Sequence, residues 1–136
     1  MRRALAAVAV ALLAGCGGGD DGERIRLVIP DNNIRDEGVE CSGARPFQQL
    51  HRGTPFRIED AEGEVVADGA LPSGLAENAD PRIDWESKRM PTVCVMELEV
   101  ELPEHASYRL VLPETAPLEF ARERLEDEPV ELVVRG

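Results

Sequence analysis

Short stretches of alternating apolar and polar residues recur along the chain from residue 24 onward. The clearest is VCVMELEVEL at 93–102, where every second residue is apolar and glutamates fill most positions between them. Successive side chains of a β-strand point to opposite faces, so this pattern predicts a strand with one face in a core and the other in water. Cys94 belongs to the apolar row and is therefore expected inside.

The same alternation predicts six further strands, joined by short links and with no long amphipathic helix among them. They are expected at 24–29, 55–60, 64–71, 108–113, 117–120 and 130–135, with one or two helical turns at 121–127. Seven short, mostly antiparallel strands bury their apolar faces when two sheets pack together. The predicted fold class is therefore an all-β sandwich in one domain, residues 24–136.

One segment of this domain resembles a known hairpin. In GTPFRIEDAEGEVVADGAL at 53–71, a strand ends in a D-x-x-G turn, here Asp60 and Gly63, and the return strand leads to Gly69. This arrangement is similar to the hairpin of prealbumin-like and carboxypeptidase-regulatory-like sandwiches. The resemblance implies a seven-stranded immunoglobulin-like or prealbumin-like sandwich and carries no catalytic residues with it.

The first 15 residues have the pattern of a targeting signal. Two arginines precede a short uncharged run at 4–13, which is too short to span a bilayer and is typical of a signal peptide. The run ends in a motif that resembles the lipobox of bacterial lipoproteins, formed by Leu13, Ala14, Gly15 and Cys16. The resemblance implies cleavage before Cys16 and lipidation (palmitate-type acyl chains) of that residue. A plain secretory signal with a chance cysteine is the alternative.

The residues after Cys16 suit a tether. Residues 17–22 are glycines and aspartates, which have no apolar side chain to bury and reach roughly 15 Å as a flexible chain. We therefore expect a lipidated cysteine and tether at 16–23, a membrane partner through the anchor, and a place on the outer face of the cytoplasmic membrane, or on the outer membrane if the source has one. Together with the hairpin and the cysteine pair, the signal resembles small lipoproteins of high-GC bacteria.

Charge and cysteine content agree with export. The net charge is −12, and loss of Arg2 and Arg3 with the signal makes it −14, which excludes nucleic acid as an expected partner. If Cys16 carries lipid, Cys41 and Cys94 remain, and two cysteines in an exported domain predict a disulfide, with two free buried thiols as the alternative. The bridge would stabilise the fold by roughly 4 kcal/mol at most, and we expect it to join the two sheets.

The stretch at 72–92 is predicted to be the longest irregular loop, and long loops in small domains are often functional. It contains the only tryptophan, Trp85, flanked by Arg82 and Arg89, which makes these three residues candidates for contact with a partner. The simpler interpretation is that Trp85 folds back with Ile83 and Met90 as a lid on the sandwich end.

No motif in the chain points to catalysis or to a cofactor. The oxygen-rich stretch at 31–38 departs from the calcium-hand pattern, because Arg35 stands where a ligand belongs. A solvated turn is expected there, with a loose calcium site as the alternative. His51 and His105 lack partners at metal-ligand spacing. We expect a monomeric, non-enzymatic binding or structural module of the cell envelope that contacts another envelope protein. A ligand or ion receptor using the acidic loops, and a small hydrolase without a recognisable motif, are the alternatives.

Overall fold

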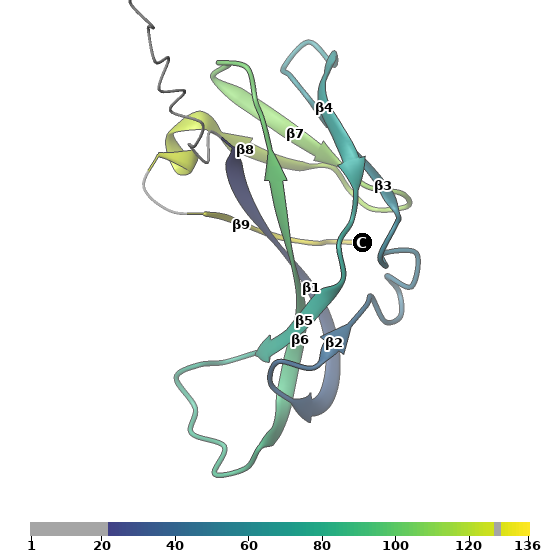
Figure 1. Cartoon of the computed structure of the whole chain (residues 1–136), viewed down its shortest axis with the longest axis vertical. Coiled ribbons are helices and arrows are strands. Elements are labelled where there is room, and N and C mark those ends of the chain that lie inside the picture. The colour runs from purple at the N-terminus through teal and green to yellow at the C-terminus, as the bar shows by residue number, and fades with distance from the viewer. Residues whose placement is uncertain (1–21, 127–128) are drawn as a thin grey trace, which may run out of the picture.

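The computed structural model describes residues 22–126 and 129–136, which form nine strands and one short 3-10 helix (Figure 1). The elements are β1 (Glu23–Asp36), β2 (Glu40–Cys41), β3 (Pro55–Glu59), β4 (Val65–Ala70), β5 (Gly74–Asn78), β6 (Arg89–Val100), β7 (Ser107–Val111), β8 (Leu118–Ala121), η1 (Arg122–Leu125) and β9 (Val130–Val133). One sheet has the strand order β2-β5-β6-β1-β9 and the other the order β4-β3-β7-β8. Every ladder is antiparallel except the parallel pair of β1 and β9.

The two sheets enclose a single hydrophobic core, which confirms the predicted all-β sandwich. The inward rows are those that the alternation predicted: they include Ile25, Leu27 and Ile29 of β1, Cys94, Met96 and Leu98 of β6, and Tyr108, Leu110 and Leu112 at β7, all at most 3% exposed. Apolar burial on this scale stabilises a domain by about 25 cal/mol per Å² removed from water, so these rows fix the register of both sheets.

The number and length of the strands differ from the prediction. Nine strands are present rather than seven, because β2 and β5 were expected to be loop. Strand β1 also continues to Asp36, and β6 begins at Arg89. These segments lack apolar alternation because their buried positions are mostly small or polar residues, so their pairing is maintained by the backbone ladder rather than by burial of a large apolar row. The buried residues are Asp31, Cys41, Gly74, Ala76 and Thr92.

The hairpin at 53–71 is confirmed. Asp60 is buried, and its Oδ1 accepts hydrogen bonds from the backbone N–H groups of Glu62 and Glu64, both at 2.9 Å. Gly63 has a φ of +84°, a conformation that residues with a Cβ rarely adopt, which explains the glycine of the D-x-x-G turn. On the return strand, a Cβ at Gly69 would lie 2.9 Å from the ring of Phe56, so the glycine makes room for this ring.

Cys41 and Cys94 form a disulfide, with their Cα atoms 5.8 Å apart. The expectation that this bridge joins the two sheets is wrong, because β2 and β6 belong to the same sheet and β5 lies between them. The disulfide crosses the face of β5 at Gly74, the residue that pairs with Cys41. A Cβ at position 74 would lie only 2.4 Å from the Sγ of Cys94, so only glycine leaves space for the crossing.

Residues 1–21 lie outside the described part of the chain, and with them the predicted signal peptide, the lipobox from Leu13 to Cys16, and most of the tether. Within residues 22–126 and 129–136, no helix is both long and apolar enough to cross a bilayer.

Candidate functional site

A two-stranded extension projects from one end of the sandwich (Figure 1). We call it the distal arm and define it as residues 31–36 of β1, residues 89–93 of β6, and the loop 79–88, which connects β5 to β6. The described chain begins at the opposite end of the long axis, where β1 starts. At about 3.3 Å per residue, the 14 residues of β1 cover roughly 40 Å, so the distal arm lies far from the point where the chain enters the domain.

The distal arm begins at a β-bulge that contains a buried polar cluster. The register of β1 against β6 shifts between Pro30 and Asn33, and Asn32 adopts a φ of +52°. The side chain of Asp31 is fully buried and pairs with the guanidinium of Arg35. Arg35 also donates from Nε to the Oγ1 of Thr92 at 2.8 Å. This cluster joins the two strands beyond the bulge and fixes the direction of the arm.

The expected solvated turn at 31–38 is therefore wrong for most of its length, since the chain there is a paired strand up to Asp36. The carboxylate of Asp31 is occupied by Arg35 and by the backbone N–H of Asn33 at 3.2 Å. Among the described residues, no group of three or more His, Cys, Asp or Glu side chains is placed to hold a metal ion.

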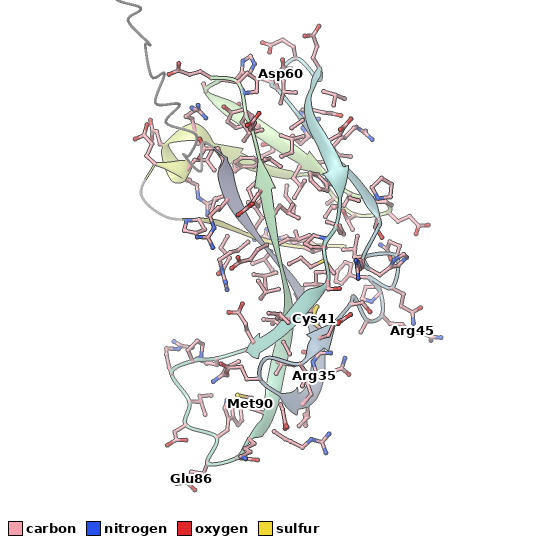
Figure 2. The ribbon with its side chains drawn as sticks, viewed as in Figure 1. Arg35, Cys41, Arg45, Asp60, Glu86 and Met90 are labelled. Carbon is pink, nitrogen blue, oxygen red and sulfur yellow. A yellow bond between two sulfur atoms is a disulfide. The ribbon has the colours of Figure 1, made fainter. Side chains whose placement is uncertain are left out.

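The loop at the tip of the distal arm is ordered by side chains that bind its own backbone. Asn78 Oδ1 accepts hydrogen bonds from the Nε1–H of Trp85 at 3.1 Å and from the N–H of Asp80 at 2.9 Å. Asp84 accepts from the N–H of Glu86 at 3.0 Å. Figure 2 places Glu86 at the extreme tip of the arm. Asparagine and aspartate make such local turns readily, so the loop has a defined shape without a core of its own.

Arg82 and Asp80 form a two-bonded ion pair on the exposed side of this loop, with both N–O distances at 2.9 Å. The hydrogen bond from the Arg82 side chain, followed by that from its backbone N–H, lowers the pKa of the Asp80 carboxyl, and the same pair raises the pKa of Arg82. Arg82 is 88% exposed and Asp80 29% exposed, so solvent screens the pair, which shapes the loop more than it stabilises the domain.

The lid interpretation of this loop is wrong. Trp85 and Met90 are half-buried, Ile83 is 43% exposed, and none of the three belongs to the core cluster. The stretch at 72–92 is also not one irregular loop, because it contains β5 and the start of β6. Trp85 instead lies on the projecting arm, fixed at its indole nitrogen by Asn78.

The three candidate contact residues share the distal arm, but each has a partner of its own. Arg82 pairs with Asp80, Trp85 bonds to Asn78, and Arg89 donates from Nη2 to the backbone oxygen of Ile34 at 3.1 Å. Ile34, which sequence analysis did not select, is 60% exposed. The sequence pattern did not indicate Ile34 as a contact residue, because its segment was expected to be a turn.

Two shallow hollows lie on the four-stranded sheet. One, about 440 Å³, includes Asp60, Tyr108, Arg109 and Arg124 in its lining, and the other, about 560 Å³, includes Phe56, Arg57, Asp68 and Val111. Neither of these two is lined by a histidine, but a third hollow of about 440 Å³ includes His51, Glu40, Ser42 and Ser73 in its lining. In the described chain, the ring of His51 bonds to the backbone oxygen of Arg52, and that of His105 lies edge-on to Tyr108.

A second feature that sequence analysis did not select lies on the outer face of the five-stranded sheet. Arg26 donates from Nη2 to Glu77 at 2.7 Å and also lies within 4 Å of Glu97 and Glu131. The hydrogen bond to Glu77 is the main cause that raises the pKa of Arg26, and burial partly opposes it. Alternation placed Arg26 and Glu97 on a water-facing side, but only the strand order brings the four side chains together.

No protein-family model, curated protein or solved structure matches this chain.

Proposed function

We propose that this chain is a lipid-anchored, extracytoplasmic binding module of the cell envelope that presents its distal arm to another envelope protein. The anchor is Cys16, which the lipobox-like sequence at 13–16 marks for lipidation. Two or more acyl chains on one cysteine anchor a protein stably, whereas a single chain binds only marginally. The place of the protein is then the outer face of the cytoplasmic membrane, or the outer membrane in a source that has one.

The disulfide supports this compartment. Disulfides persist in oxidising surroundings and are rare in the cytosol. The bond between Cys41 and Cys94 is buried, and Gly74 leaves the space that it needs. The packing of the fold therefore accommodates the disulfide. A chain that folds around such a bond is suited to the exterior of the cytoplasmic membrane.

The observation that carries the proposal is the position of the distal arm. The chain enters the domain at residue 22, at the end opposite the loop 79–88 (Figure 1). A domain tethered through its N-terminus therefore directs this loop away from the bilayer. Exposed apolar side chains on a polar, ordered loop are typical of contact surfaces, and here Ile83 and Ile34 accompany the half-buried Trp85.

Two measurements test the two parts of this proposal. For the anchor, Cys16→Ser should abolish labelling by a palmitate analogue and move the chain out of the membrane fraction. For the contact, a photo-crosslinking residue at Ile83 in the lipidated protein should yield a discrete adduct in intact cells. The same residue at Glu62, in the turn at the anchor-proximal end, is the control.

The outcomes separate the two parts. A wild-type chain that takes up no lipid label would refute the anchor, whatever the crosslinks show. Adducts at Glu62 as strong as those at Ile83, or none at Ile83, would refute the distal arm as the contact surface while leaving the anchor intact.

A further inference from the structure

An apolar row crosses the outer face of the five-stranded sheet. The strand registers place Leu75 of β5 beside Val95 of β6, Val95 beside Val28 of β1, and Val28 beside Val133 of β9. We call these four residues the outer row. All four side chains point away from the core, because each alternates with an inward residue of its strand. Leu75 is 54% exposed and Val133 41% exposed, whereas Val28 and Val95 are buried.

The centre of the outer row is covered by an ion pair rather than by a layer of the fold. Arg26 lies on β1 one outward position before Val28, and Glu77 lies on β5 one outward position after Leu75. The line between them crosses β6 at Val95, and their side chains meet at 2.7 Å. The aliphatic part of an arginine side chain covers apolar surface well, which accounts for the burial of Val95.

This face carries more negative than positive charge around the row. The guanidinium of Arg26 lies near three carboxylates, Glu77 at 2.7 Å, Glu97 at 3.5 Å and Glu131 at 3.7 Å. Arg24 pairs with one of them, Glu97, at 3.1 Å, so two guanidiniums face three carboxylates. Glu40, the residue beside Leu75 on β2, is exposed and adds a further acid at the end of the row. If Glu77 is released, Arg26 still has two acidic neighbours, so opening the cover does not leave a charge without a partner.

We propose that the outer row is a docking surface for a basic amphipathic segment of a partner protein. Apolar side chains of the segment lie on Leu75 and Val133, and a lysine or arginine of the segment takes the place of Arg26 at Glu77. Arg26 then turns to Glu97 and Glu131, and Val95 becomes part of the contact. This proposal concerns a different face from the distal arm and does not rest on the function proposed for the arm.

Charge selects this occupant over others. A second copy of the chain would bring the same carboxylates against one another across a symmetric contact, and like charges oppose such pairing. An anionic bilayer surface is repelled for the same reason. A segment that combines apolar and basic side chains matches both the exposed ends of the row and the acids around it.

The experiment uses the full chain in nanodiscs of phosphatidylcholine and two fluorescent 14-residue peptides, one of leucine and lysine in a helical amphipathic pattern and one with glutamate in place of lysine. Binding is followed by fluorescence anisotropy, with empty nanodiscs subtracted. The variant Leu75→Ser/Val133→Ser removes the exposed ends of the row without changing charge. Val65→Ser is the matched control, because Val65 is 53% exposed on β4 of the other sheet.

We expect the lysine peptide to bind and the glutamate peptide not to bind. The Leu75→Ser/Val133→Ser variant should bind the lysine peptide about tenfold more weakly, while Val65→Ser should change its affinity less than about twofold. Equal effects of the two variants, or binding of the glutamate peptide, would overturn the proposal. A dimer in analytical ultracentrifugation that Leu75→Ser/Val133→Ser abolishes would also overturn it and assign the row to a second copy.

Discussion

The substitution Gly74→Ala tests why a glycine stands under the disulfide. In the oxidised protein the new Cβ would lie 2.4 Å from the Sγ of Cys94 and 3.0 Å from both the Sγ and the backbone oxygen of Cys41. Carbon and sulfur cannot approach so closely, so the bridge or the strand must shift. Overpacking of this kind destabilises a protein by about 1–3 kcal/mol, and we expect Gly74→Ala to fall in that range.

The loss of unfolding free energy caused by Gly74→Ala should depend on whether the two sulfur atoms are present. In the Cys41→Ala/Cys94→Ala background both sulfurs are absent, and the remaining close atom is the backbone oxygen of Cys41. The background itself should lose roughly 4 kcal/mol, the chain-entropy value for a bridge between residues 53 positions apart. Gly74→Ala should then add less than about 1 kcal/mol, which gives a coupling of about 1–2 kcal/mol in the double-mutant cycle.

Urea unfolding followed by far-UV circular dichroism measures each corner of this cycle. Gly69→Ala is the control, because its Cβ would meet the ring of Phe56 at 2.9 Å and should be indifferent to the cysteines. If Gly74→Ala destabilises the protein equally with and without the disulfide, the crossing of the bridge over this residue is not the reason for the glycine, and the steric argument fails.

Three further predictions concern the distal arm. Trp85→Ala should reduce the unfolding free energy by about 1 kcal/mol rather than the 3–5 kcal/mol of a core aromatic, because the ring is half-buried outside the core; a urea melt showing a larger loss would contradict this position. Asp31→Ala should destabilise the protein by about 3 kcal/mol in the same assay, since it leaves the largely buried guanidinium of Arg35 without its carboxylate; a loss under 1 kcal/mol would show that the cluster is not needed at the bulge. The pKa of Asp80 should lie below the usual range of aspartate, so the ion pair with Arg82 orders the loop above the ordinary aspartate pKa and is lost as the pH falls through the lowered pKa. Carboxyl NMR shifts measured against pH check this. An ordinary Asp80 pKa in the wild type, or an Asp80 pKa unchanged in Arg82→Ala, would refute it.

The sequence predicted the strands whose apolar side chains are buried in the core better than the strands whose side chains are not. Where an apolar row faces the core, as with Ile25 to Ile29 or Cys94 to Val100, the alternation located the strand and its inward face correctly. The hairpin turn was also predictable, because Asp60 and Gly63 have local roles that depend only on their spacing. In these segments, local sequence and tertiary packing require the same conformation.

The remaining features depend on which strands lie next to one another in each sheet, and the sequence does not give this strand order. Gly74–Asn78 pairs with β6 without an apolar alternation of its own, and the segment after Pro30 continues as a strand because a bulge and the Asp31 cluster hold it to β6. The pairing of Cys41 with Cys94 followed from counting cysteines, but its place within one sheet required the strand order. The same holds for Arg26 and its carboxylates, which come from four different strands.

The long strand β1 also determines how a pulling force would pass through the molecule. It begins where the chain enters the domain, ends in the distal arm, and is paired at twelve positions with β6 and at four with β9. In the proposed arrangement, with the N-terminus anchored and a partner on the arm, tension would act parallel to β1, which is paired on both sides over Ile25–Val28. Such a load would shear both ladders at once instead of opening hydrogen bonds one after another from an edge, a geometry in which the paired strands resist separation together.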